Sequence, residues 1–468
     1  MVSYRMETNL SVVILAAGLG TRMKSRKAKV LHHAGGLTLV EHVVNSALAI
    51  TSPNRVIVVV GHQSEQVQAT LAATGVHFAL QAEQRGTGDA LAVCRDVTPD
   101  REGLLIVLYG DCPLLAVETL HTLVDHHRNS RAAATVITTM LDDPTGYGRA
   151  IVNDSGHVEA IVEHKVATEE QRRVRQINSG IYCFDAPLLW KHLAGIAPNP
   201  VTKEYYLTDI VEILNRAGHR VSALLHADSN ELMGINTRIE LAIVDRIFRE
   251  RKVRQLMLDG VTIEKPETVI VDLPVEAGLD SVIEPFVQLL GNTSIGENCR
   301  IGSGSIIRDS RLGDGVEIAP YTLIASSTIE AGATIGPFAR LRPGNHVMTA
   351  AHIGNFVELK KTTLGAGAKA GHLAYLGDSV IGAGTNIGAG TIVCNYDGAR
   401  KHQTTIGDRV FVGSNSTLVA PVEIRSGSYI AAGSVVTKGV PEDALALGRS
   451  RQVNKEGWAK KRREQKKS

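Results

Sequence analysis

Cysteine is scarce in this chain of 468 residues, and the few that occur form no pattern. The five are Cys94, Cys112, Cys183, Cys299 and Cys394, with no CxxC pair and no spacing to histidine that a structural zinc site requires. We therefore expect neither a disulfide framework nor a zinc site, and this composition favours a reducing compartment.

Long apolar runs and a strong net charge are also missing. The longest N-terminal apolar run, residues 12–17, is far too short to cross a membrane, and a glycine-rich turn follows it in place of a cleavage site. The formal net charge is only +2, so no global field attracts nucleic acid. We expect a cytoplasmic protein that binds neither membrane nor nucleic acid.

The most informative feature that is present is a period of six residues in the last third of the chain. Neither a helical period nor strict alternation fits it, and such a hexapeptide repeat predicts a parallel β-helix. Three short strands form each triangular coil, the aliphatic residue points inward, and coils stack at roughly 4.8 Å. The recurring positions are Ile295, Ile301, Ile307, Leu312, Ile318, Ile324, Ile329, Ile335, Leu341, Val347, Ile353, Leu359, Ile381, Ile387, Val393, Ile406, Val412, Leu418, Ile424, Ile430 and Val436.

Two segments interrupt this period. The first is residues 365–378, which contain His372, and the second begins at Cys394 and runs as a polar loop to Thr405. Functional residues are concentrated on such irregular segments, so we expect a site here and place His372 in a loop. The alternative is that the β-helix is only a scaffold or spacer.

Composition divides the rest of the chain, which is too long for a single core. Residues 10–235 alternate strand-like and helical patterns, which predicts an α/β domain with a largely parallel sheet. Residues 238–258 predict one amphipathic helix with an apolar stripe of Ile239, Ile243 and Ile247, which Val244 and Phe248 widen. The opposite face, expected to be solvated, is formed by Arg246, Arg249, Glu250 and Arg254. We expect domains at 1–236 and 259–450, a linker helix at 237–258, and a basic tail at 451–468 whose end is disordered.

The first strand of the α/β domain, residues 12–15, leads into a glycine loop at residues 16–22. Ligands bind at this end of the strands in open α/β sheets, and loop N–H groups can hold phosphate oxygens. The loop is neither a dinucleotide fingerprint nor a P-loop. Asp111 follows the strand at 104–108, and Lys29 follows the loop. Taken alone, Asp111 could be a turn residue before Pro113, and Lys29 a solvated lysine.

Together these segments resemble the signature of sugar-1-phosphate nucleotidylyltransferases, although that family usually has proline where this chain has Ala28. The resemblance implies a Rossmann-like nucleotidyltransferase fold and Mg²⁺ held by Asp111 and Asn236. Glu204, Tyr205 and Tyr206 resemble sugar-contacting positions. The implied UTP- and UDP-sugar-binding residues are Leu15, Ala16, Ala17, Gly18, Arg22, Lys29, Gln81, Gly86, Thr87, Tyr109, Gly110, Asp111, Gly148, Glu163, Asn178 and Asn236.

The C-terminal segments 340–344, 358–361, 365–378 and 394–398 resemble the acetyltransferase half of one family. This family is that of the bifunctional N-acetylglucosamine-1-phosphate uridylyltransferase/glucosamine-1-phosphate N-acetyltransferases. With the N-terminal half included, the resemblance covers nearly the whole chain. It implies a left-handed β-helix, a homotrimer with sites between subunits, and His372 as the base, oriented by Asn386 or a nearby carbonyl. The implied glucosamine-phosphate-binding residues are Arg342, Lys360, Tyr375 and Asn386, and those for acetyl-CoA are Ala389, Asn395, Tyr396, Ser414, Ala432 and Arg449.

Several of these assignments have simpler alternatives. His372 could be a surface imidazole, and Ala432 could be a corner residue whose small size the repeat demands. The expected function is acetylation of glucosamine-1-phosphate by acetyl-CoA, then uridylyl transfer from UTP to the product, which the family uses for cell-envelope sugars. The rival hypotheses are a single-activity nucleotidylyltransferase with a regulatory β-helix, and an oligomeric carbohydrate- or nucleotide-binding scaffold.

Overall fold

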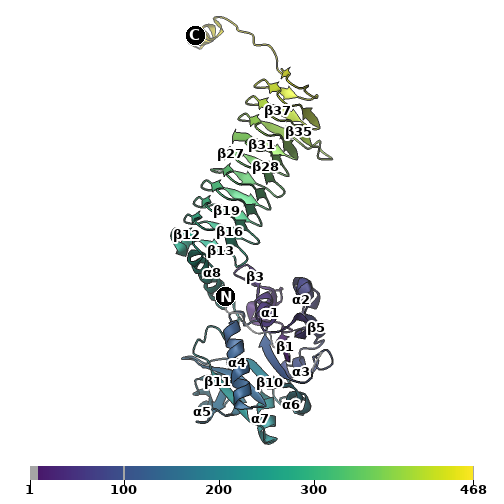
Figure 1. The fold of residues 1–468 in the computed structure, drawn as a ribbon, viewed down its shortest axis with the longest axis vertical. Coiled ribbons are helices and arrows are strands. Elements are labelled where there is room, and N and C mark those ends of the chain that lie inside the picture. Colours follow the sequence, from purple (N-terminus) through teal and green to yellow (C-terminus); the bar gives the residue numbers. More distant parts are fainter. Residues whose placement is uncertain (1–8, 99–100, 467–468) are drawn as a thin grey trace. The chain divides into compact units, whose positions relative to one another are not determined.

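The computed structural model describes residues 9–98 and 101–466. The chain divides into two compact units, residues 1–247 and 248–468, and each is described by itself (Figure 1). Within the described ranges, no helix is both long enough and apolar enough to cross a membrane.

The N-terminal unit is built on a nine-stranded sheet with the order β11-β7-β10-β6-β1-β4-β5, from which β8 and β9 extend beside β10. The strands are β1 (Leu10–Leu15), β4 (Val56–Val60), β5 (His77–Leu80), β6 (Leu104–Tyr109), β7 (Ala134–Met140), β8 (Arg149–Val152), β9 (Val158–Val162), β10 (Gln176–Asp185) and β11 (Val221–Leu225). A small hairpin is formed by β2 (His33–Ala34) and β3 (Leu37–Thr38). The helices are α1 (Leu39–Leu48), α2 (Ser64–Leu71), α3 (Thr87–Ala92), α4 (Val117–Ser130), α5 (Glu169–Arg172), α6 (Ala186–His192) and α7 (Asp209–Arg216).

The sheet is mixed, and only partly the largely parallel sheet that the sequence predicts. β1 pairs in parallel with both β4 and β6, and β4 pairs in parallel with β5, so the ligand-binding end expected from the pattern is formed by these four strands. β10, however, pairs antiparallel with β6 and β7. Its apolar run looks the same in either direction, because both faces of the sheet are buried in apolar clusters.

The C-terminal unit is the predicted parallel β-helix, which forms three long ladders of short strands. Face 1 has eleven strands from β12 (Thr262–Ile263) to β41 (Leu445–Ala446), and face 2 has ten from β13 (Ile270–Val271) to β40 (Val435–Val436). Face 3 has nine, from β14 (Glu276–Ala277) to β38 (Val422–Ile424). On face 1 the inward residues stack in register and are all buried: Ile283, Ile301, Ile318, Ile335, Ile353, Ala370, Ile387, Val412 and Ile430.

The first predicted interruption is wrong. Residues 365–378 continue the coil, with Leu364, Ala370 and Leu376 buried in the three ladders. The inward position of this coil on face 1 is occupied by Ala370, and the hexapeptide pattern, which counts only larger aliphatic residues, does not detect it. His372 therefore ends strand β30 (Lys369–His372), not a loop, and its side chain is exposed. The second interruption is confirmed: residues 395–403 leave the coil between β34 (Ile392–Cys394) and β35 (Thr404–Ile406).

The corner between faces 1 and 2 carries a row of exposed aromatic residues, which we call the aromatic column. It comprises Phe286, Tyr321, Phe338 and Phe356, which have φ values of 64°, 59°, 55° and 59°. The last three stack, with ring centroids 5.4 and 5.5 Å apart. Leu373 occupies the same corner position one coil further on, where φ is 50°.

The expected long helix is α8 (Arg238–Leu258), but its predicted apolar stripe is only partly right. Val244 and Phe248 are buried, whereas Ile239 is 75% exposed. The face expected to be merely solvated includes Arg249, which donates to the Asp272 carboxylate at 2.8 Å. The buried stripe continues along the helix through Val253 and Leu256, which lie beyond the predicted series.

The basic tail ends differently from the expectation. Residues 458–465 form helix α9 (Trp458–Gln465), which has no buried residue, so the predicted disorder is wrong for this segment. Its alanine, lysine, arginine and glutamine residues favour a helix intrinsically, without packing. Residues 467–468 lie outside the described ranges.

Candidate active sites

The glycine loop after β1 brings Lys29 to the end of the sheet. Gly20 has φ +63°, and a β-carbon there would lie 2.6 Å from Cβ of Lys29, so only glycine allows this close approach. Gly18 is different, because nothing lies within 4 Å of where its β-carbon would be. Its backbone is therefore open to a ligand.

Ala28 explains how the turn keeps its shape without the usual proline. Its backbone dihedrals, φ −54° and ψ 140°, are ones that proline adopts. The Ala28 N–H, which proline lacks, donates to Oε1 of Gln63 at 2.6 Å, and Nε2 of Gln63 donates to the Arg26 carbonyl at 2.8 Å. A side-chain clamp thus takes the place of the ring.

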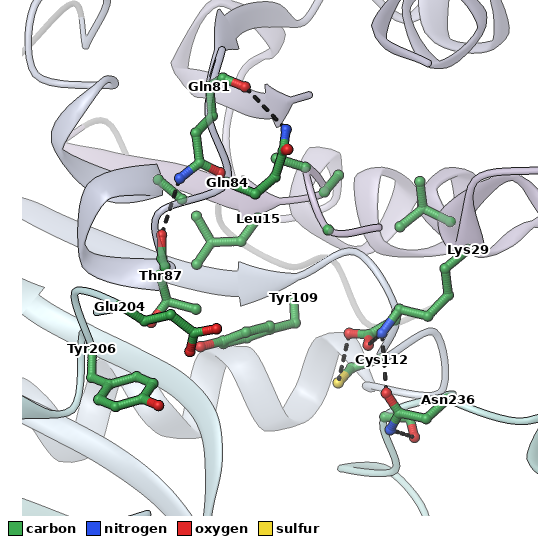
Figure 2. Close-up of a pocket in the computed structure, with 18 of the residues that line it drawn as sticks. Leu15, Lys29, Gln81, Gln84, Thr87, Tyr109, Cys112, Glu204, Tyr206 and Asn236 are labelled. Atoms are coloured by element: carbon green, nitrogen blue, oxygen red, sulfur yellow. Dashed lines mark hydrogen bonds and ion pairs between the residues drawn. The ribbon is translucent and has the colours of Figure 1, made fainter. Parts of the chain in front are cut away.

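Four polar side chains from distant parts of the sequence meet at this end of the sheet. Figure 2 shows two of them, Lys29 and Asn236, pointing toward each other. The Lys29 ammonium forms an ion pair with the Asp111 carboxylate and donates to Oδ1 of Asn236 at 3.2 Å. Arg22 donates to the same amide oxygen at 2.7 Å. The Ile235 N–H bonds to the Asp111 carbonyl at 2.9 Å, which fixes the two segments beside each other.

This arrangement fits a bound divalent cation. Two hard oxygens, from Asp111 and Asn236, already converge on one positively charged group, the Lys29 ammonium. In the described part of the chain, no group of three or more His, Cys, Asp or Glu side chains could hold a metal.

The four side chains border a cavity of about 520 Å³. Twelve of the sequence-predicted residues line it: Leu15, Ala16, Ala17, Gly18, Arg22, Lys29, Gln81, Gly86, Thr87, Tyr109, Asp111 and Asn236. The predicted residues Gly110, Gly148, Glu163 and Asn178 are not among the lining residues. Glu204 and Tyr206, quoted as sugar-contacting positions, do line it, together with residues that the sequence did not single out: Val30, Gln84, Ala90, Cys112, Tyr147, Ser179, Leu232 and Gly234.

Hydrogen bonds fix the wall of the cavity that contains Gln81 and Gly86. Gln81 is buried and donates through Nε2 to Asp89 at 2.8 Å and to the Gly86 carbonyl at 3.1 Å. The Gly88 N–H donates to the Tyr205 carbonyl at 2.8 Å. Gly86 has φ +113°, and a β-carbon there would lie 2.5 Å from that same carbonyl oxygen.

Gly148, Glu163 and Asn178 form a group of their own. A β-carbon on Gly148 would lie 3.6 Å from Oε1 of Glu163 and 3.7 Å from Cβ of Asn178, so the three converge. Burial raises the pKa of Glu163. Burial, reinforced by the charge of Glu163, also raises the pKa of Tyr109, whose ring packs where a side chain at Gly180 would stand. Charge and aromatic surface are thus close together at this end.

In the β-helix, His372 stacks directly on the preceding coil. It pairs in register with Asn355, the last residue of β27 (His352–Asn355), and Nδ1 of His372 lies 2.5 Å from Oδ1 of Asn355. An amide oxygen only accepts, so Nδ1 carries the proton and Nε2 keeps its lone pair in the neutral ring. Of the two partners expected, Asn386 or a nearby carbonyl, the structure has the second, the side-chain carbonyl of Asn355. Asn386 lies at an outward position of β33 (Asn386–Ile387), in register with Lys369 and not with His372.

Three of the predicted acetyl-CoA residues share the corner position of His372. Ala389, Ser414 and Ala432 each follow an inward ladder residue of face 1 by two positions, as His372 does. We call this row, from His372 to Ala432, the small-residue column. Asn395 and Tyr396 lie on the excursion 395–403. Arg449 is exposed and lies three residues beyond β41, a strand that the hexapeptide count did not reach.

Cationic side chains gather at the next corner of the coil, between faces 2 and 3. Arg342 donates to Glu358 at 3.2 Å, and contact with the amine of Lys401 lowers the pKa of Lys360, with the Lys401 and Arg342 charges adding to the effect. Tyr375 approaches the same region, because a β-carbon on Gly377 would lie 2.6 Å from its hydroxyl and from Nδ2 of Asn395. Lys401 was missed, since no sequence spacing relates it to Lys360.

Two glycine substitutions test the geometry of the N-terminal cavity. Gly86→Ala forces a β-carbon against the Tyr205 backbone at a φ that alanine avoids, so we expect about 2–4 kcal/mol of lost unfolding free energy. Gly18→Ala meets nothing and should change it by less than about 0.5 kcal/mol. Urea denaturation followed by circular dichroism measures both. Equal stability of the two variants would contradict the described loop.

Comparison with known proteins gives the same division. Residues 12–177 match the model of the MobA-like NTP transferase domain. Residues 280–309 match that of the bacterial transferase hexapeptide (six repeats), and residues 403–438 that of the hexapeptide repeat of succinyl-transferase.

Full-length relatives are similar over both parts of the chain. The bifunctional protein GlmU of Solibacter usitatus is 56% identical over 97% of this chain and 97% of its own length. That of Koribacter versatilis is 50% identical over 99% and 100%, and that of Streptococcus agalactiae 44% over 96% and 97%. Neither a single-activity nucleotidylyltransferase nor a binding scaffold accounts for such similarity. The chain belongs to the bifunctional GlmU family, the N-acetylglucosamine-1-phosphate uridylyltransferase/glucosamine-1-phosphate N-acetyltransferases.

Proposed function

We propose that residues 1–236 carry the uridylyl transfer of this family and residues 259–450 the acetyl transfer. Acetyl-CoA acetylates glucosamine-1-phosphate, and the product reacts with UTP to give UDP-N-acetylglucosamine and pyrophosphate. The observation that carries the first assignment is the meeting of Arg22, Lys29, Asp111 and Asn236 at the cavity. We also propose the cytoplasm as the compartment, because unpatterned cysteines suit a reducing environment.

In uridylyl transfer the nucleophile is a phosphate oxygen that is already anionic, so the protein needs to bring anions together, not to remove a proton. Arg22 and Lys29 supply positive charge where the triphosphate and the departing pyrophosphate lie. The exposed backbone at Gly18 admits the phosphates, and the buried Gln81 with the half-buried Gly86 forms the wall for the base. The convergent Gly148, Glu163 and Asn178 are proposed to hold the sugar.

Members of this family depend on a divalent metal, and we propose Mg²⁺ held by Asp111 and Asn236. The bound ion supplies charge neutralisation at the triphosphate. Asp111 also fixes Lys29 through their ion pair, and Glu240 accepts from the Asn236 N–H at 2.6 Å, which holds that residue in place. The two ligands are therefore positioned by their neighbours.

Asp111→Ala should separate the two activities. Removing the carboxylate takes away a proposed metal ligand and the partner of Lys29, so pyrophosphate release should fall by at least about 10³-fold. CoA release, measured in the same preparation with acetyl-CoA and glucosamine-1-phosphate, should be unchanged. Loss of both activities in a folded variant would refute the two-site assignment.

For acetyl transfer we propose His372 as the base that takes a proton from the amine of glucosamine-1-phosphate. Asn355 holds Nδ1–H, which leaves Nε2 free to accept the proton as nitrogen attacks the thioester carbon and CoA leaves. Arg342, Lys360 and Lys401 are proposed to bind the 1-phosphate, with Tyr375 and Asn386 on the sugar. Ala389, Ser414, Ala432, Asn395, Tyr396 and Arg449 are proposed to contact acetyl-CoA.

His372→Ala should lower acetyl transfer by about 10²–10⁴-fold with little change in acetyl-CoA affinity. The side chain is exposed and not on an inward ladder, so the coil should remain intact. Residual acetylation should rise with pH, because more of the amine is then unprotonated. Uridylyl transfer from N-acetylglucosamine-1-phosphate is the internal control. Near-normal acetylation at neutral pH would leave His372 a binding residue at most.

Hexapeptide-repeat enzymes form oligomers, and we propose a homotrimer. The aromatic column supports this, because four aromatic residues expose their rings while holding a backbone conformation that costs roughly 1–2 kcal/mol each. Covering them with a neighbouring copy would offset that cost. The column reaches Leu373, which adjoins His372, so the same neighbour would close the acetyl-transfer site.

Phe338→Asp tests this assembly. A charge in the middle of the column should convert the trimer to smaller species in sedimentation velocity and lower CoA release, while pyrophosphate release persists. The matched control is Val380→Asp, because Val380 is exposed on face 3 of the β-helix. The assembly proposal fails if Phe338→Asp stays trimeric, or if both variants dissociate equally.

A further inference from the structure

The excursion 395–403 carries three groups that the proposed acetyl-transfer site needs. Asn395 and Tyr396 are assigned to acetyl-CoA, and Lys401 to the 1-phosphate. This nine-residue loop leaves the hydrogen-bonded ladder between β34 and β35, so the ladder does not fix the positions of these three groups. Their positions depend on the conformation of the loop. What holds the loop therefore determines how the site is organised.

The root of the loop is tied to the coil beneath it. Asn395 is buried and donates through Nδ2 to Asp378 at 2.5 Å, and the Thr404 N–H donates to the Asp378 carbonyl at 3.1 Å. The Asp378 N–H in turn donates to the Lys360 carbonyl at 2.8 Å. Both ends of the excursion are thus anchored next to Lys360.

The tip is a tight hairpin held by one carboxylate. Tyr396 and Lys401 form an antiparallel bridge, and the His402 N–H donates to the Asn395 carbonyl at 2.8 Å. Oδ1 of Asp397 accepts from the N–H groups of Ala399 and Arg400 at 2.7 and 2.6 Å. Oδ2 of Asp397 accepts from Nε2 of His402 at 2.7 Å.

Both carboxylate oxygens of Asp397 accept hydrogen bonds from the loop itself. The Arg400 N–H, His402 and the Ala399 N–H together hold the pKa of Asp397 far below its usual value, so the carboxylate stays charged at any working pH. All three donors belong to the hairpin, so the Asp397 carboxylate holds the loop itself together. Its bonds span residues 397–402, the segment that contains Lys401.

We propose that Asp397 is a positioning residue for acetyl transfer, which shapes the hairpin so that Tyr396 and Lys401 meet their ligands without ordering the loop on binding. His402 is its partner at the return end. This inference rests on the proposed function of the β-helix unit. A preorganised loop lowers the entropic cost of binding, so its loss should appear in KM more than in kcat.

The test compares three variants of the full-length protein in the CoA-release assay. Asp397→Ala should raise KM for acetyl-CoA and for glucosamine-1-phosphate by about 10-fold, with kcat changed less than about 3-fold. Asp397→Asn keeps an oxygen for the Ala399 and Arg400 N–H groups and should restore most of the loss. His402→Ala removes only the Oδ2 contact and should raise KM by about 2- to 3-fold. Uridylyl transfer should be unchanged in all three.

Lys401→Ala separates this inference from the function on which it rests. If Lys401→Ala impairs acetylation while Asp397→Ala does not, Asp397 does not position the loop and the inference is overturned. If Asp397→Ala and Asp397→Asn lose kcat equally at unchanged KM, the carboxylate acts in the chemistry and the inference is again overturned. If Lys401→Ala leaves acetylation intact, the assignment of this loop to the site fails first.

Discussion

The structure depends above all on the register between successive coils. Each coil offers its strand edges to the next, and inward aliphatic side chains lie directly above one another, so a shift by one residue would turn an entire ladder outward. Register also places side chains that are 17 residues apart in contact, as with Asn355 and His372. The coil-to-coil backbone register that stabilises the β-helix thus also brings the Asn355 side chain to the proposed base.

The N-terminal unit obtains its site from a different constraint. The parallel strands β1, β4 and β6 end at one edge of the sheet, and the segments that leave them carry Lys29 and Asp111. Asn236 joins them from the far end of the unit through the backbone bond between Ile235 and Asp111. In this unit the shared direction of the strands brings the residues together. Gly20 and Gly86, at positive φ, let the backbone approach Lys29 and Tyr205 closely.

Much of this could be predicted from the sequence, for identifiable reasons. Period six predicts the β-helix because each inward residue carries the signal locally, and the glycine loop with Lys29 and Asp111 follows the end of predicted strands. Ala370 was missed because alanine gives little contrast, which created a false interruption around His372. Asn355, Lys401 and Gln63 were missed because their roles arise from contacts between coils or loops, and no local spacing encodes these. The antiparallel direction of β10 was missed because a strand buried on both faces has the same composition in either direction.

The small-residue column has a consequence for the length of what can bind along it. His372, Ala389, Ser414 and Ala432 occupy equivalent corners of four consecutive coils, so three steps of roughly 4.8 Å separate the first from the last. An extended molecule lying on this row, with its reacting carbon at His372, meets one coil every 4.8 Å or so and reaches the fourth after about 14 Å. The spacing between coils then sets the length of ligand that fits the row. Adding or deleting one coil would change that length by roughly 4.8 Å.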